Sequence, residues 1–336
     1  RGGLAMVSIG VSLFFAEISG SAVADVAALG SILIPEMKKR GYGAPFAAAV
    51  TSSSASLAII IPPSIPMILY AVSANTSVEQ LFVAGFIPGL MGAIGLMGVS
   101  WWFARRYNLP VEEAFNWPRL RHAAIEAGPT FLLPIIILGG IFGGFVTATE
   151  AAGLAVLAAI GVGIWYREVD FRQLHRAMLE GGMQTAVVMV LVAASVLMGG
   201  FLTRAQIPQE LAAQMVAFTD SKYVILLILN VFFLIIGFFL HSAAAIILVV
   251  PIVVPLIQQV GIDPVHFGLV VTLNLAIGQQ TPPVASVLIT ACSIARANIW
   301  EVTRVNLPFI GVLVGVLLIC TYVPAIPMFL VELFYR

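Results

Sequence analysis

The stretch TSSSASLAIIIPPSIPMILY, residues Thr51–Tyr70, places hydroxyl side chains and two adjacent prolines inside a segment apolar enough for a lipid bilayer. Proline removes a backbone hydrogen bond and clashes with the preceding turn, so the Pro62-Pro63 pair interrupts any helix through this segment. In a bilayer, an interrupted backbone is tolerated only where protein or a water-filled cavity covers it. The stretch therefore predicts a broken transmembrane helix whose break lies in a polar site.

The composition of the whole chain is that of a membrane protein. Of the 336 residues, 60% are hydrophobic and 10% are charged, against about 25% charged residues in soluble domains. The 16 basic and 16 acidic residues cancel, which gives no electrostatic case for a nucleic-acid partner. Cys292 and Cys320 lie singly in apolar runs, so we interpret them as packing residues.

A second interruption follows the first at a distance of 220 residues, where Pro282-Pro283 repeats Pro62-Pro63. The same lag relates further residues that set backbone geometry: Pro35 and Pro255, Gly41 and Gly261, Pro88 and Pro308, Gly95 and Gly315. The apolar segments Leu4–Pro35 and Tyr223–Pro255 also correspond, and each is interrupted at its centre. Their arms of about 15 residues are too short to span a bilayer. We therefore expect two re-entrant helical hairpins.

The other apolar runs predict ordinary crossings and an orientation. Five continuous crossings are expected at about Leu81–Phe103, Pro129–Val146, Ala151–Tyr166, Gln184–Thr203 and Val305–Val331. Basic clusters follow the first hairpin, the first and third crossings and the second broken helix, which predicts a common cytoplasmic side. Arg204 and Lys222 weaken this bias. The chain crosses an odd number of times between the two hairpins, so the second copy is expected to be inverted.

These patterns predict an all-α polytopic membrane protein with an inverted structural repeat, two re-entrant hairpins and two broken helices. The expected domains are a first transport repeat at 1–73 (hairpin 1–38, broken helix 44–73), scaffold helices and amphipathic linkers at 74–220, a second transport repeat at 221–293 (hairpin 222–257, broken helix 264–293) and a C-terminal scaffold helix at 294–336. Inverted repeats with broken helices near the membrane midplane are typical of secondary transporters.

Three stretches resemble a known family. SGSAVADVAALGSILIPEMKKRGYGAPFAAAV (19–50), IPPSIPMILY (61–70) and PIVVPLIQQVGIDPVHFGLVVTLNLAIGQQTPPV (251–284) are similar to the large membrane subunit of the tripartite ATP-independent periplasmic (TRAP) transporters. The resemblance covers nearly the whole chain. The family's large subunit has a few more spanning helices before the first hairpin, which this sequence lacks at its abrupt start.

The resemblance implies an elevator-type importer of the bacterial inner membrane. It implies coupling to a sodium gradient, with Na⁺ as the coupling ion and no other cofactor. The substrate would be a small carboxylate, such as a dicarboxylate or a sialic acid, delivered by a periplasmic substrate-binding protein. A small membrane subunit would brace the scaffold in the lipid bilayer.

By motif, the resemblance also implies two sodium sites, each between a hairpin tip and the break of the neighbouring helix. The residues of the first are Ser19, Gly20, Ser21, Ile61 and Pro62, and those of the second are Gly237, His241, Ser242, Gly278, Thr281 and Pro282. The substrate carboxylate would lie between them, near Ser53, Ser54, Ser64 and Asn274. Alternatively, hydroxyl side chains in membrane helices merely allow close packing or bond back to their own helix.

The second tip departs from the family pattern. Many relatives have an acidic residue where this chain has His241 and a glycine where it has Ala285, and Gln279 and Gln280 are unusually polar for that loop. Ionisable residues inside a membrane are functional candidates. We hypothesise that His241 pairs with Glu17, although each could instead reach water separately. Asp25 could take part in coupling, but bracing of the first hairpin is the favoured interpretation.

Three alternatives remain open from the sequence. A stand-alone divalent-anion/sodium symporter would share the inverted arrangement of hairpins but would need no binding protein. An intramembrane enzyme would need a nucleophile with a base, and Ser21 has only a distant His241. A structural membrane subunit would not need two corresponding breaks.

Overall fold

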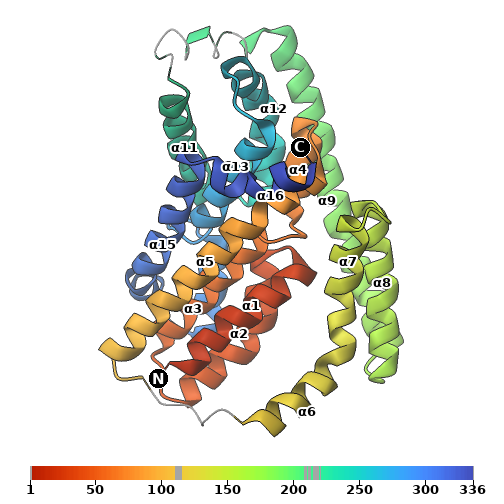
Figure 1. Ribbon diagram of the computed structural model, residues 1–336, viewed down its shortest axis with the longest axis vertical. Coiled ribbons are helices and arrows are strands. Elements are labelled where there is room, and N and C mark those ends of the chain that lie inside the picture. Colours follow the sequence, from red (N-terminus) through yellow and green to blue (C-terminus); the bar gives the residue numbers. More distant parts are fainter. Residues whose placement is uncertain are drawn as a thin grey trace. The chain divides into compact units, whose positions relative to one another are not determined.

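The computed structural model describes residues 2–109, 116–207, 210, 213–214, 219 and 221–335. Parts of the expected scaffold region at 110–115 and between 208 and 220 lie outside the described residues, as do the two terminal residues. The regular elements in the described ranges are all helices (Figure 1). They are α1 (Gly3–Ser19), α2 (Ala22–Lys39), α3 (Ala44–Ala55), η1 (Ser56–Ile59), α4 (Ile65–Ala74), α5 (Val78–Arg106), α6 (Trp117–Ala127), η2 (Gly128–Phe131), α7 (Leu132–Phe142), α8 (Ala148–Trp165), α9 (Phe171–Arg204), α11 (Lys222–Phe239), α12 (Ser242–Val260), α13 (Pro264–Gly278), α14 (Ser286–Ala295), α15 (Ile299–Tyr322) and α16 (Ala325–Tyr335).

The chain forms two compact units. One comprises residues 1–112 and 195–336 and contains both predicted hairpins and both broken helices. The other comprises residues 113–194, with α6, α7, α8 and most of α9. In the second unit, a capping box begins α8: Thr147 accepts from the Glu150 amide, and the Glu150 carboxylate accepts from the Thr147 amide.

Seven helical segments among the described residues are long and apolar enough to cross a membrane. They are Val78–Arg106, Trp117–Phe142, Ala148–Trp165, Phe171–Leu202, Lys222–Phe239, Ser242–Val260 and Ile299–Tyr322. The prediction of an all-α polytopic membrane protein is confirmed.

The helix boundaries repeat at the lag of 220 residues. The helices α1 to α5 correspond in order to α11 to α15, with starts that agree to within one residue. The Pro62-Pro63 and Pro282-Pro283 bonds are both cis, and Gly41 and Gly261 are both left-handed, with φ of +85° and +75°. The packing is exchanged between the copies: α12 packs against α4, and α2 packs against α14. The inverted orientation in a membrane stays a prediction.

Two sequence predictions about helix length are wrong. The expected crossing Val305–Val331 is two helices, because α15 ends at Tyr322 and α16 begins at Ala325. Pro324 cannot continue a helix, and a residue that precedes proline is pushed toward extended backbone. The hairpin arms are 17 and 18 residues in α1 and α2, and 18 and 19 residues in α11 and α12. The arms exceed the expected 15 residues because the polar residues at each tip remain helical almost to the turn. Arm length therefore does not distinguish a re-entrant hairpin from a pair of spanning helices.

Two further crossings have different bounds from those expected. The run Gln184–Thr203 belongs to the 34-residue helix α9, which starts at Phe171. In the run Pro129–Val146 the helical part consists of η2 and α7 and ends at Phe142, before Gly143 and Gly144, of which Gly144 has φ +69°. A glycine in the left-handed region is a common helix terminator.

Candidate functional site

The tip of the first hairpin lies directly on the break of the first broken helix. Gly20 has φ +61°, a conformation that glycine adopts without steric cost. A Cβ atom at Gly20 would lie 2.7 Å from the carbonyl oxygen of Pro63. The amide of Ile65 donates to the Gly20 carbonyl at 3.3 Å. The break and the tip therefore satisfy each other's backbone, as membrane-embedded irregular structure requires.

The second hairpin contacts the second break in the same way. The amide of Val284 donates to the carbonyl of Phe238 at 3.2 Å. A Cβ atom at Gly278 would lie 2.6 Å from the Cα and the carbonyl carbon of Gly237. Two glycines thus allow the hairpin and the end of α13 to touch along their backbones.

Both tips and both breaks meet at one small cavity of about 30 Å³. Its lining consists of Gly20, Ser21, Ala22, Ile59, Ile65, Pro66, His241, Ser242, Ala243 and Gln279. One water molecule needs roughly 10–15 Å³ of such space. The cavity has room for a water molecule or a dehydrated small ion, but it is too small for an organic acid.

The structure brings four of the eleven predicted ion-site residues to this cavity: Gly20, Ser21, His241 and Ser242. The other seven are not among its lining residues. Ile61 packs against Gly89, and the Thr281 hydroxyl donates to the carbonyl of Ile277 in the preceding helix, α13, at 3.0 Å. Gln279 lines the cavity but was not predicted as a site residue. Its unusual polarity in an apolar loop was the available signal.

The predicted substrate residues are fully buried and take part in separate hydrogen-bond networks. The Ser53 hydroxyl oxygen lies 2.8 Å from Gln280 Oε1 and 2.6 Å from Asn306 Oδ1. The Ser54 and Ser12 hydroxyls are 2.9 Å apart, and Asn274 donates to Asn230 Oδ1 at 2.6 Å.

Ser64 has a structural position. Its hydroxyl donates to the Ile59 carbonyl at 2.7 Å and accepts from the Met67 amide at 3.4 Å, so it caps the start of α4. None of the four predicted substrate residues lines the small cavity.

No ion pair joins Glu17 and His241 among the described residues of this conformation, and their hypothesised pairing in transport stays a prediction. In the described part of the chain, a salt bridge joins Arg40 Nε to Glu36 Oε1 at 2.9 Å. His241 instead precedes α12 and accepts a hydrogen bond at Nδ1 from the Ala243 amide at 3.4 Å. The histidine caps a helix, which a sequence reading of charge complementarity did not anticipate.

Asp25 is engaged within its own hairpin. The Ser19 hydroxyl donates to Asp25 Oδ1, and the Ser21 amide donates to the Ser19 hydroxyl at 3.2 Å. Asp25 is fully buried, and its Oδ2 atom has no hydrogen-bond partner among the described residues. These contacts favour bracing of the tip over contact with a ligand.

A stability prediction follows from Ala285, which has φ +48° and is buried at the start of α14. The left-handed conformation costs an L-residue with a Cβ atom about 1–2 kcal/mol, while glycine adds roughly 0.4–1 kcal/mol of unfolded-chain entropy. We expect Ala285→Gly to raise the free energy of unfolding by about 0.5–1 kcal/mol in a denaturation measurement. The control Ala24→Gly, at an exposed position inside α2, should lower it. A loss of stability in Ala285→Gly would contradict the strained conformation.

The apolar helices and the meeting of tips and breaks define the class: a multi-pass membrane protein with the broken-helix architecture that is typical of secondary transporters. The chain belongs to the family described as "Tripartite ATP-independent periplasmic transporter, DctM component", which matches residues 1–326. The resemblance that the motifs indicated is confirmed, and the interpretation as an intramembrane enzyme is set aside.

Curated relatives cover almost the whole chain. The chain is 42% identical over 330 residues to the isethionate TRAP transporter permease protein DctMQ of Oleidesulfovibrio alaskensis, covering 98% of this chain and 52% of that protein. It is 37% identical to the C4-dicarboxylate TRAP transporter large permease protein DctM of Pseudomonas aeruginosa, covering 97% of this chain and 77% of that protein. It is 36% identical to the sialic acid TRAP transporter large permease protein SiaM of Vibrio cholerae, covering 99% of this chain and 78% of that protein. The chain thus spans about half the length of the first relative and about three quarters of the other two.

Proposed function

We propose that the chain is the ion- and substrate-translocating part of a sodium-coupled TRAP importer for a small organic acid in the bacterial inner membrane. Residues 1–73 and 221–293 form the moving transport domain in an elevator mechanism, and 74–220 with 294–336 form the scaffold. A periplasmic binding protein delivers the substrate, and a small membrane subunit braces the scaffold. Na⁺ is a co-substrate rather than a resident cofactor.

The observation that supports this proposal most strongly is the cavity shared by both hairpin tips and both helix breaks. Half-helix ends and unwound carbonyls at such breaks can replace the hydration shell of a small cation. The hydroxyls of Ser21 and Ser242 come from the two different tips, so an ion held there would join the hairpins. The size of the cavity, about 30 Å³, suits one dehydrated ion.

The relatives support the class of substrate and of partner. Their names specify isethionate, C4-dicarboxylate and sialic acid, which are all organic acids of different size. We therefore propose an organic acid without naming one. The relative from Oleidesulfovibrio alaskensis is named DctMQ, which joins the DctM component to a second component in one name. That name supports a small membrane subunit as a partner.

Sodium binding is tested by thermal unfolding of the purified protein in NaCl and in KCl at equal ionic strength. A ligand that binds only the folded state stabilises it by mass action. We expect Tm to be higher in NaCl by about 2–4 °C, and Ser21→Ala and Ser242→Ala each to reduce that difference. The control Ser31→Ala removes an exposed hydroxyl on α2 and should preserve it. Equal Tm in both salts would remove sodium from the mechanism.

Uptake into proteoliposomes under a sodium gradient, with and without a periplasmic binding protein, tests the remainder. Uptake that requires both the gradient and the binding protein is expected. Uptake that needs no binding protein would favour a stand-alone symporter.

A further inference from the structure

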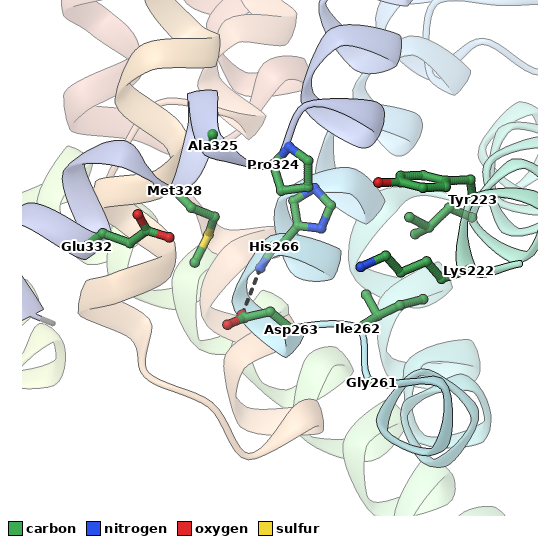
Figure 2. Close-up of a pocket in the computed structure, with 11 residues that line it drawn as sticks. Lys222, Tyr223, Gly261, Ile262, Asp263, His266, Pro324, Ala325, Met328 and Glu332 are labelled. Carbon is green, nitrogen blue, oxygen red and sulfur yellow. Dashed lines mark hydrogen bonds between the residues drawn. The ribbon is translucent and has the colours of Figure 1, made fainter.

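A larger cavity lies at the foot of the second hairpin, away from the tips (Figure 2). Its volume is about 280 Å³, and the first turn of α11, the connection between α12 and α13 and the junction of α15 and α16 surround it. The polar residues that line it are Lys222, Tyr223, Asp263, His266 and Glu332. This cavity has no role in the proposed transport.

Two of these polar side chains are already engaged in the fold. His266 Nε2 lies 2.8 Å from the carbonyl oxygen of Cys320, and Asp263 Oδ1 accepts from the amides of Val265 and His266 at the start of α13. Lys222 and Glu332, which come from opposite sides of the cavity in Figure 2, form no hydrogen bond or ion pair with any residue in the described part of the chain. The cavity is therefore lined by one cation, Lys222, and by two carboxylates, of which Asp263 accepts two backbone amides and Glu332 has no hydrogen-bond partner in the described part of the chain.

The corresponding place in the first repeat is closed, which shows that the fold itself does not require the cavity. Phe46 corresponds to His266, and its ring lies 6.1 Å from that of Tyr42 and 5.3 Å from that of Phe103, measured between centroids. A Cβ atom at Gly2, the counterpart of Lys222, would lie 2.5 Å from the Cβ of Ala104. Aromatic packing and a close contact fill the space that the second repeat leaves open and lines with charge.

The surroundings of the cavity are those of a lipid-facing surface near the headgroups. Lys222 is the first residue of α11, a candidate membrane span, and its Nζ lies 5.7 Å from the centroid of the Tyr223 ring. Lysine and tyrosine at the end of a membrane helix are typical of the headgroup level. The two helices that contribute to the cavity, α11 and α16, also carry exposed large apolar side chains: Leu227, Val231, Phe329 and Leu333. Acyl chains could cover these side chains.

We propose that this cavity binds the headgroup of a zwitterionic phospholipid of the phosphatidylethanolamine class. The phosphate lies toward the Lys222 ammonium and the Tyr223 hydroxyl, which point the same way in Figure 2, and the ethanolamine ammonium lies toward Glu332. An anionic lipid would satisfy Lys222 but would leave Glu332 facing a like charge. The site gives a reason for Lys222, a basic residue on the side where the charge bias predicts few. It does not depend on the proposed transport activity.

The test is thermal unfolding of delipidated protein in detergent with added phosphatidylethanolamine, phosphatidylglycerol or free phosphoethanolamine, with native mass spectrometry to count retained lipids. Phosphatidylethanolamine is expected to raise Tm by about 2–4 °C, and phosphatidylglycerol to raise it less. Lys222→Gln should reduce the effect of both lipids. Glu332→Gln should remove the advantage of phosphatidylethanolamine over phosphatidylglycerol.

The matched controls are Lys39→Gln and Glu301→Gln, two exposed charges that do not line the cavity. Both should respond to the lipids as the unmodified protein does. Three results would overturn the proposal: an equal lipid response in Lys222→Gln and Glu332→Gln, a stronger effect of phosphatidylglycerol on the unmodified protein, or a full Tm rise with free phosphoethanolamine. The last result would indicate a soluble zwitterion in place of a lipid.

Discussion

Gly278→Ala is expected to destabilise the protein by about 1–3 kcal/mol, the usual cost of overpacking, and to abolish uptake. The added Cβ atom would lie 2.6 Å from the Cα and carbonyl carbon of Gly237. Both are backbone atoms, so no flexible side chain can move aside. The second hairpin would have to separate from the end of α13, and the cavity that both tips line would lose its shape.

The matched control is Gly315→Ala, a glycine inside α15 whose Cβ atom would meet no neighbouring atom within 4 Å. Alanine in a helix interior is favoured over glycine by about 0.5–1 kcal/mol, so this variant should be as stable as the unmodified protein or more so. Denaturant unfolding measures stability, and proteoliposome uptake measures transport. Equal stability of the two variants would contradict the close approach of the hairpin to the break.

Asp25→Ala is expected to reduce uptake at least tenfold, whereas Asp25→Asn should retain most of it. The Ser19 hydroxyl donates to Asp25 Oδ1, and the Ser21 amide donates in turn to Ser19. Alanine removes the acceptor that holds the tip, and loss of a buried hydrogen bond costs about 1–3 kcal/mol. Asparagine keeps an oxygen that can accept the same bond.

The pair of variants separates bracing from charge coupling. Asp25 Oδ2 is buried without a hydrogen-bond partner among the described residues, and burying a neutral amide is less costly than burying a carboxylate. Asp25→Asn should therefore be at least as stable as the unmodified protein in thermal unfolding. If Asp25→Asn lost uptake as completely as Asp25→Ala while remaining folded, the charge itself would be required, and bracing would be the wrong role.

Prediction from sequence succeeded best where a residue type dictates backbone geometry. Pro62-Pro63 and Pro282-Pro283 interrupt their helices where expected, and Gly41 and Gly261 end theirs in the left-handed conformation. Prediction failed at Val305–Val331, where a continuous apolar run was read as one helix although the chain leaves the helical conformation near Pro324. Hydrophobicity reports that a segment prefers lipid or a protein core, but it does not report where a helix ends.

The candidate site was predictable only in outline. Gly20, Ser21, His241 and Ser242 line the cavity as tip residues should. Ser64 and Thr281 do not, because their hydroxyls donate to carbonyls at the end of the helix that precedes each of them. A sequence pattern shows which polar residues lie near a break, but a hydroxyl can satisfy its hydrogen bond locally or across helices. That choice depends on which neighbours come within about 3 Å.

The sequence alone therefore determined the class, the positions of the breaks and the 220-residue repeat, because proline, glycine and long apolar runs act locally on the backbone. Only the tertiary structure decided that both tips share one cavity, that His241 caps α12, and that the second repeat keeps an open charged cavity where the first is filled. These outcomes depend on contacts between residues that are far apart in the sequence, some of them in different copies of the repeat. Such contacts are set by how all the helices pack together, and no local pattern encodes them.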